Sequence, residues 1–136
     1  SGSCFLIKRQ AFLQTHGFDE KYFLYSEDVD LCMRLFSNGW HIYIYKQSKI
    51  IHLKGASTHQ NYYSLILNRY RSKLIYSKKH YSFIKYSLLH FWVLLGLFMR
   101  LLLVPFKKNN QEGEKKQRIL GYISSILIWI HYKANI

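Results

Sequence analysis

The most informative stretch of the sequence covers residues 25–34 and reads Tyr25-Ser26-Glu27-Asp28-Val29-Asp30-Leu31-Cys32-Met33-Arg34. It holds three of the seven acidic residues in a chain of 136 residues whose formal net charge is +13. Apolar residues recur at the spacing of one helical face through Val29, Cys32, Met33 and Phe36, and Asn38-Gly39 supplies a stop signal. The stretch therefore predicts a helix over residues 27–37 that opens on carboxylates.

Two explanations for these crowded carboxylates are open. In the first, they stabilise the start of the helix, with Ser26 as its cap and the negative charges at the positive end of the helix dipole. In the second, one carboxylate is a catalytic base and the others set its environment. The neighbouring motifs favour the second explanation.

The charge of the chain divides it into two parts. Residues 1–58 hold 7 Lys or Arg and 5 Asp or Glu, a net charge of +2, whereas residues 59–136 hold 13 and 2, a net charge of +11. Aromatic residues continue through the basic part. We therefore expect a near-neutral folded part at 1–58 and a basic helical tail at 59–136 that faces an anionic surface.

The first part predicts an α/β fold. Short apolar strands are expected at residues 4–7, 40–45 and 50–53, and helices at 9–15 and 27–37. The strict alternation after Gly39 places Trp40, Ile42 and Ile44 on one face of a strand. Because the chain opens directly on an apolar strand and holds few strands, we expect it to be part of a larger sheet and a fragment of a longer protein.

The second part predicts helices at residues 62–85, 86–106 and 119–130, the last after a polar linker at 107–118. The run 86–106 carries one formal charge, Arg100, and as a helix it extends roughly 31 Å, about the thickness of a bilayer core. It can span the bilayer, lie in its interface or pack against the remainder of the protein. Basic clusters on both sides and Arg100 itself favour a helix in the interface.

Several motifs come in a fixed order that resembles a known enzyme family. They are Ser1-Gly2-Ser3-Cys4-Phe5-Leu6-Ile7-Lys8-Arg9, Gly17-Phe18-Asp19-Glu20, the acidic stretch at 27–34, Gly39-Trp40, and His52 with Gly55-Ala56-Ser57-Thr58. This order resembles the C-terminal half of the catalytic domain of family 2 glycosyltransferases, and most of all the bacterial rhamnosyltransferase-like branch that builds cell-surface polysaccharides. The likeness covers residues 1 to about 58, and a basic, apolar helical tail is also common in that branch.

The resemblance implies a partial GT-A (Rossmann-like) sheet followed by an α-helical, membrane-associated tail. It implies inverting transfer of a sugar from a nucleotide-diphosphate donor to a hydroxyl of a cell-surface glycan or lipid-linked acceptor. The implied cofactor is a divalent metal, Mg²⁺ or Mn²⁺. The implied location is the cytoplasmic face of the bacterial inner membrane, where the protein is peripheral or monotopic.

The resemblance also implies roles for individual residues. Asp28 matches the catalytic base, and Glu27 beside it either orients the acceptor or raises the proton affinity of the base by like-charge repulsion. His52 matches a position that places a histidine on the metal, whereas the residue alone would equally suit a strand histidine bonded to backbone. Trp40 and Arg34 are assigned to substrate binding.

Simpler roles for two of these residues stay open. Trp40 is at least as well explained as a core residue at the start of a strand. Arg34 lies four residues after Asp30, the spacing of a helical ion pair.

The family's donor-binding half and its Asp-x-Asp metal motif are missing from these residues. Asp28-Val29-Asp30 fits that motif in letters only, because it opens a helix. We therefore expect this chain alone to be inactive. The alternative function is a non-enzymatic membrane-surface module, and the absence of a nucleic-acid motif argues against a nucleic-acid partner.

Overall fold

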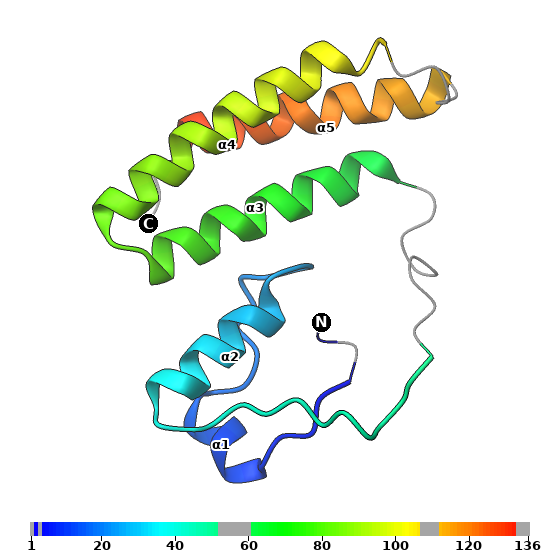
Figure 1. Cartoon of the computed structure of the whole chain (residues 1–136). Helices are drawn as coiled ribbons and strands as arrows, with labels where there is room; N and C mark the ends of the chain where they lie inside the picture. The colour runs from blue at the N-terminus through cyan, green and yellow to red at the C-terminus, as the bar shows by residue number, and fades with distance from the viewer. Residues whose placement is uncertain (1, 3, 52–60, 107–111, 133–136) are drawn as a thin grey trace.

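The computed structural model describes residues 2, 4–51, 61–106 and 112–132. Its helices are α1 (Arg9–Gln14), α2 (Glu27–Ser37), α3 (Tyr62–His80), α4 (Phe83–Leu103) and α5 (Glu112–His131). Helices α3, α4 and α5 lie together at one end of the molecule, and α1 and α2 form a smaller unit at the other end, with α2 nearer to α3 (Figure 1).

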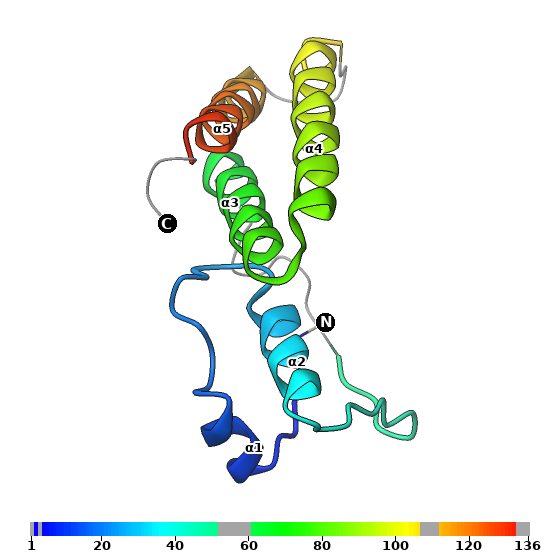
Figure 2. The same cartoon turned by 90° about the vertical axis from the view of Figure 1, so that its left-hand side faces the viewer.

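The prediction of a partial Rossmann-like sheet is wrong, because the residues that the structure describes contain helices and no strand. The segment after α2 runs out from the body of α1 and α2 (Figure 2). Its side chains are exposed, with Ile44 at 87%. Alternating apolar residues indicate which face of a strand can be buried. The backbone N–H and C=O groups of a strand also need a neighbouring strand as hydrogen-bond partner. No such neighbour lies beside this segment in the described part of the chain.

The helices predicted at 9–15 and 27–37 are confirmed to within a residue. The face of α2 that carries the apolar pattern is not the face that is buried. Val29 and Phe36 are 48% and 67% exposed, while Asp30, Leu31 and Leu35 are buried. The buried face of α2 therefore includes a carboxylate, which an apolar pattern cannot reveal.

A small apolar cluster holds α1 against α2. It consists of Ala11, Leu31 and Leu35, with Ile7, Phe12 and Trp40 packed around it. Each of these side chains is close in sequence to one end of α1 or α2. The cluster therefore forms locally, and it is too small to fix how this unit sits against α3.

A second and larger apolar cluster joins α3, α4 and α5. Its buried members are Ile66, Leu74, Val93, Leu97, Val104, Tyr122 and Trp129. Helices α3 and α5 approach closely at Gly121, where an added Cβ would lie 3.1 Å from Ile66 Cβ. The indole N–H of Trp129 also donates to the carbonyl of Tyr70 at 3.0 Å. The close approach at Gly121 and the hydrogen bond of the Trp129 indole therefore hold α3 and α5 firmly together.

Two helix boundaries in this layer differ from the predicted ones. The break between α3 and α4 falls at Tyr81 and Ser82 instead of after residue 85, and α5 begins at Glu112 instead of 119. Glu112 and Glu114 lie in the first turn of α5, where negative charge stabilises a helix, and the residues that follow are strong helix formers. The stretch called a polar linker is therefore largely helical from Glu112 onward.

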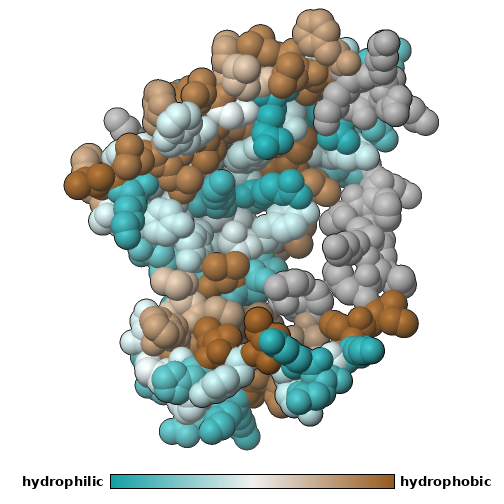
Figure 3. All heavy atoms as spheres, viewed as in Figure 1, coloured by the Kyte–Doolittle hydropathy of each residue, from teal (hydrophilic) through white to brown (hydrophobic). Residues whose placement is uncertain are grey.

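Helix α4 has an exposed apolar surface. Among the described residues it is the one helix long and apolar enough to cross a membrane, by length and composition alone. Only Val93 and Leu97 of this helix are buried. Apolar side chains gather along α4 and α5 at the top of the molecule in Figure 3. Within the described part of the chain, α4 is therefore not a core helix.

Candidate functional site

Two residues with left-handed backbone lead into α2. Tyr25 has a φ of 71° and Ser26 has a φ of 66°. Such a conformation costs a non-glycine residue of the order of 1–2 kcal/mol, so it persists only where the surroundings hold it. Ser26 occupies the predicted N-cap position, and its carbonyl accepts from the N–H of Asp30 at 2.9 Å, but its side chain makes no capping hydrogen bond. This turn places Glu27 and Asp28 side by side at the start of the helix.

Asp28 is half-buried and has no ion-pair partner in the described part of the chain. Its Oδ1 accepts from the N–H of Val29 at 2.8 Å. The backbone of Gly2 passes directly against it, since an added Cβ at Gly2 would lie 2.8 Å from Asp28 Cβ and 3.2 Å from Oδ2. Residue 2 must therefore be small, and the beginning of the chain forms one wall of the environment of this carboxylate.

Glu27, beside Asp28, is also half-buried. Its Oε2 is fully buried and has no hydrogen-bond partner among the described residues. A buried acceptor without a donor costs about 1–3 kcal/mol, so it needs an explanation. The unsatisfied oxygen marks a place where a donor from outside the chain would be stabilised.

Asp30 is the centre of a buried ionic network. Its carboxylate is 0% exposed, and it lies 2.7 Å from Arg34 Nε, 2.7 Å from His80 Nε2 and 2.9 Å from Lys79 Nζ. The hydroxyl of Tyr22 donates to it at 3.2 Å. We call these five residues the Asp30 network. Burial by itself raises the pKa of Asp30, but the hydrogen bonds from His80, Lys79 and Arg34 outweigh it and lower the pKa to about 2.

The Asp30 network joins the two parts of the molecule. Arg34 belongs to α2, whereas Lys79 and His80 belong to the last turn of α3. Lys79 also pairs with Asp19, in the loop before α2, at 2.7 Å. The orientation of α2 on α3, and with it the position of Glu27 and Asp28, therefore depends on a charged contact.

The predicted pair of Asp30 and Arg34 is confirmed. The guanidinium of Arg34 also donates to the carbonyls of Thr15 and Gly17, the latter at 2.7 Å. Arg34 thus holds the turn after α1 onto α2. Its predicted contact with substrate stays a prediction, and any such contact would have to share a guanidinium that is already engaged.

Trp40 packs against the apolar cluster of α1 and α2. Its indole N–H donates to Gln14 Oε1 at 3.1 Å, and Lys8 Nζ lies 5.9 Å from the ring centre. Trp40 is thus half-buried against a small core, although the strand that it was expected to begin is not formed. Its predicted role in stacking on a sugar stays a prediction.

The predicted metal ligand, His52, lies outside the described residues, as does the motif at 55–58. Among the residues that are described, no group of three or more His, Cys, Asp or Glu side chains is arranged to hold a metal ion. The described carboxylates therefore do not form a metal site by themselves.

Sequence reasoning missed the partners that Asp30 finds on α3. Lys79 and His80 are 49 and 50 positions further along the chain. A basic last turn in a helix is normally explained by the helix dipole, so these residues carried no special signal. The usable signal was the scarcity of acidic residues, because a carboxylate in so basic a chain will attract cations from distant segments.

A pair of half-buried carboxylates at the start of a helix, held by a third carboxylate with cationic partners, defines a candidate site for activating a hydroxyl group. The family model described as glycosyl transferase family group 2 matches residues 1–132. The chain therefore belongs to this glycosyltransferase family. No solved structure gave a significant match.

Three curated relatives place the chain more closely within the family. It is 40% identical over 82 residues to the N-acetylglucosaminyl-diphospho-decaprenol L-rhamnosyltransferase of Mycobacterium tuberculosis, which covers 60% of this chain and 27% of the relative. It is 38% identical over 52 residues to the rhamnosyltransferase WbbL of Escherichia coli K12, covering 38% of this chain and 20% of the relative. It is 32% identical over 57 residues to the O-antigen biosynthesis protein RfbC of Myxococcus xanthus, covering 42% and 4%. The chain thus resembles rhamnosyltransferases but spans only about a quarter of the mycobacterial protein.

The Asp30 network predicts a large loss of stability when its centre is neutralised. Asp30→Asn leaves Arg34 and Lys79 partly unpaired in a buried site, so we expect the free energy of unfolding to fall by about 3 kcal/mol. Urea unfolding measures this change. Asp19→Asn is the matched control, because it removes a more exposed partner of the same lysine and should cost less than about 1 kcal/mol. Equal losses in the two variants would contradict a central role for Asp30.

The same measurement has a predicted pH dependence. The pKa of Asp30 is lower in the folded protein than its ordinary value, so its stabilising effect is complete above about pH 4 and is lost as the pH falls toward 2. The unfolding free energy of the unmodified protein should therefore decrease over that range. The decrease should be clearly smaller in Asp30→Asn.

Proposed function

We propose that this chain is the acceptor-side part of an inverting glycosyltransferase. The enzyme moves a sugar from a nucleotide-diphosphate donor to a hydroxyl of a cell-surface glycan or of a lipid-linked acceptor, and Asp28 is the general base. The observation that carries the proposal is the half-buried carboxylate of Asp28 at the start of α2, free of ion pairs in the described part of the chain. The chain belongs to a glycosyltransferase family, and sugar transfer to a hydroxyl needs a proton acceptor such as this carboxylate.

The reaction needs a group that accepts a proton. A sugar hydroxyl is a weak nucleophile, so a carboxylate within hydrogen-bond reach takes its proton as its oxygen attacks the anomeric carbon. The new bond forms on the face opposite the diphosphate, whose bond to that carbon breaks, and the configuration inverts. The nucleoside diphosphate leaves with the bonding electrons, and the proton stays on Asp28.

The environments of the three neighbouring carboxylates support Asp28 in this role. Asp30, with its pKa lowered to about 2 and its oxygens engaged by cations, is a poor proton acceptor at neutral pH. Asp28 uses Oδ1 to accept from the N–H of Val29, and its Oδ2 has no hydrogen-bond partner among the described residues. Glu27 offers a buried oxygen without a donor, which an acceptor hydroxyl would satisfy. We therefore assign Asp28 to proton transfer and Glu27 to acceptor orientation.

The relatives suggest the first substrates to try. Two of them are named as rhamnosyltransferases, and the mycobacterial one is named for an acceptor with N-acetylglucosamine on decaprenol diphosphate. We propose a nucleotide-activated L-rhamnose as donor and a polyprenyl diphosphate-linked sugar as acceptor. The donor half is expected outside these 136 residues, so assays should use the full-length gene product.

The base assignment predicts the effect of Asp28→Asn on sugar transfer. The variant keeps the shape of the side chain but cannot accept a proton, so we expect the transfer rate to fall by roughly 10²–10⁴-fold. Rates are measured with radiolabelled donor under single-turnover conditions, and the urea midpoint should change little because Asp28 has no ion pair in the described structure. Glu20→Gln, which alters an exposed carboxylate in the preceding loop, is the control.

Transfer by Asp28→Asn close to that of the unmodified enzyme would remove Asp28 from the base role. It would also favour the alternative of a membrane-surface module without catalytic function. Loss of transfer in Asp28→Asn together with Glu20→Gln would point to a general effect of charge.

We further propose that a divalent metal, Mg²⁺ or Mn²⁺, acts at the diphosphate and that His52 is one of its ligands. When bound, such an ion stabilises negative charge on the leaving diphosphate. Chelation should abolish transfer by the full-length protein, and added Mg²⁺ or Mn²⁺ should restore it. His52→Ala should raise the metal concentration needed for half-maximal rate, whereas His16→Ala, at an exposed turn, should not. Transfer that is unaffected by chelation would overturn the metal proposal.

The protein is also proposed to lie on the cytoplasmic face of the bacterial inner membrane, held by α4 and α5. Exposed apolar residues recur on α4 at helical spacing, among them Leu88, Phe91, Leu95 and Phe98. A contiguous apolar strip beside many basic residues is typical of a helix that lies in an anionic membrane interface. A lipid-linked acceptor would be reached from that position.

Membrane contact through α4 predicts a specific loss of vesicle binding. Phe91→Glu combined with Leu95→Glu should weaken binding of the full chain to anionic vesicles by about tenfold or more, because two apolar side chains no longer enter the interface. Co-sedimentation measures the binding. The control pair Phe23→Glu and Ile44→Glu introduces the same charge at sites that are 82% and 87% exposed but far from α4 in sequence. Equal losses in both pairs would contradict docking through α4.

A further inference from the structure

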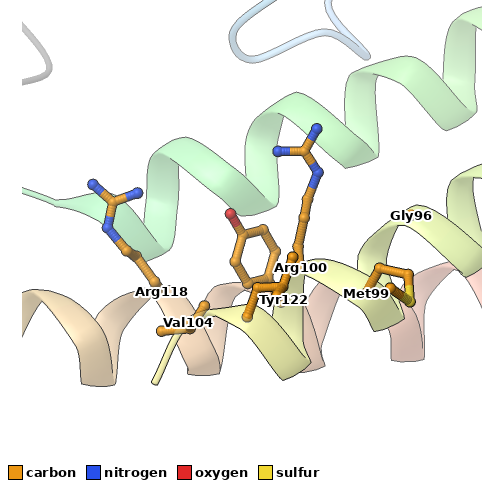
Figure 4. A pocket seen from close by; sticks show the side chains of 7 residues that line it. Gly96, Met99, Arg100, Val104, Arg118 and Tyr122 are labelled. Carbon is orange, nitrogen blue, oxygen red and sulfur yellow. The ribbon is translucent and has the colours of Figure 1, made fainter. Parts of the chain in front are cut away.

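A hollow of about 410 Å³ lies between the end of α4 and the first half of α5. Apolar side chains form much of its wall, including Met99, Leu103 and Val104. Three polar side chains reach into it, namely Arg100, Arg118 and Tyr122. In Figure 4 the ring of Tyr122 stands between the two arginines, and its hydroxyl lies on the same side as both guanidinium groups, which extend toward α3.

Neither arginine of this hollow has an ion pair with a carboxylate among the described residues. All seven Asp and Glu side chains of the sequence are described, and the ion pairs between described residues involve Asp19 and Asp30. The Nε of Arg118 is fully buried and has no hydrogen-bond partner in the described structure. A buried, unpaired guanidinium N–H is costly, so the site lacks an acceptor.

Arg118 is also held in place without being neutralised. Its guanidinium carbon lies 4.0 Å from the centre of the Tyr62 ring, which fixes the plane of the group. The neighbouring residue Gln117 accepts a hydrogen bond from the N–H of Tyr62 at 2.9 Å, which ties this part of α5 to the start of α3. The donors are therefore preorganised on rigid elements.

The chemistry of these donors fits a phosphate group. Two guanidinium groups and a phenol hydroxyl can bond several phosphate oxygens at once, and arginine favours planar, bidentate contacts with such anions. Over residues 100–118 the sequence holds six Lys or Arg and two Glu, so its net charge is positive. The hollow is large enough for a phosphate or diphosphate.

The surroundings of the hollow indicate that the anion is attached to an apolar chain. Two of the apolar side chains that line the hollow, Met99 and Leu103, are 48% and 55% exposed. A free, fully hydrated phosphate would gain nothing from these side chains, whereas a hydrocarbon chain would bury them.

We propose that the Arg100–Arg118–Tyr122 hollow binds the phosphate or diphosphate group of a lipid whose hydrocarbon chain lies along α4 and α5. Two lipids share this chemistry, a membrane phospholipid and a polyprenyl diphosphate that carries the acceptor sugar. The second source rests on the proposed function, and the first does not.

The test measures binding of the full chain to three kinds of vesicle. The first contains neutral phosphatidylcholine alone, the second adds polyprenyl diphosphate, and the third adds phosphatidylglycerol at the same surface charge. Arg100→Gln combined with Arg118→Gln removes both guanidinium groups. Arg71→Gln combined with Lys73→Gln removes two exposed positive charges from α3 and is the matched control.

We expect the pocket pair to lose about tenfold or more in affinity for the added phosphate lipid, and the control pair to lose clearly less. A loss confined to polyprenyl diphosphate identifies the acceptor lipid, and a loss with both added lipids identifies the phosphate of anionic membrane lipids in general. Equal losses in the pocket and control pairs would overturn the proposal, because the charge of the tail alone would then explain binding. Inorganic pyrophosphate that binds as tightly as the vesicles would overturn the lipid assignment.

A second variant guards against a simple folding defect. Gly96 lines the hollow, and an added Cβ there meets no atom within 4 Å. Gly96→Leu should therefore fill the space without changing any charge, and it should weaken phosphate-lipid binding with an unchanged urea midpoint. Vesicle binding requires neither a donor sugar nor Asp28, so Asp28→Asn should bind normally. A failure of the lipid-site proposal and a failure of the proposed role of Asp28 would therefore give different results.

Discussion

The structure depends on one buried carboxylate. Asp30 is inaccessible to solvent and is held by Arg34 of its own helix and by Lys79 and His80 of α3. The apolar clusters of the molecule lie on either side of this contact and do not include it. A buried ion pair contributes less net stability than apolar packing of the same volume. It nevertheless restricts the relative positions of the two helices, because a buried charge that loses its partner is very costly. Asp30 therefore sets the orientation of α2 on α3 more than it adds to the stability of either part.

Local features of this protein could be predicted from the sequence, and features that depend on distant partners could not. Helices α1 and α2 follow from short-range spacing and stop signals, and the pair of Asp30 and Arg34 follows from one turn of helix. The strands expected near residues 4–7 and 40–45 required neighbours that the described chain does not supply. The apolar pattern of α2 runs through Val29, Cys32, Met33 and Phe36, and it does not reveal the buried face, because that face includes a carboxylate whose partners lie about 50 residues away. Asp28 and Glu27 were assigned as base and neighbour from the resemblance to the glycosyltransferase family, and these roles stay predictions.

Three acidic residues in one turn of α2 have three different environments. Among the described residues, Asp30 is paired with three cationic side chains, Asp28 accepts one backbone hydrogen bond, and Glu27 keeps a buried oxygen without a donor. Neutralising the innermost carboxylate with cations from α3 limits its repulsion of the two outer ones, which lie nearer the start of the helix and the beginning of the chain. The same network that positions the turn therefore also leaves Asp28 and Glu27 available for substrate.

The uneven use of positive charge explains why the basic tail needs an external partner. With 20 Lys and Arg against 7 acidic residues, most cations cannot be neutralised within the chain, and the ion pairs that form are concentrated at Asp19 and Asp30. Arg100 and Arg118 have no ion pair within the described part of the chain and lie beside exposed apolar side chains of α4 such as Met99 and Leu103. The exposed apolar side chains are unfavourable in water. A partner that covers them must also keep the neighbouring positive charges solvated or matched by negative charge. An anionic lipid surface meets both requirements at once, since its phosphates match the arginines and its chains cover the apolar residues.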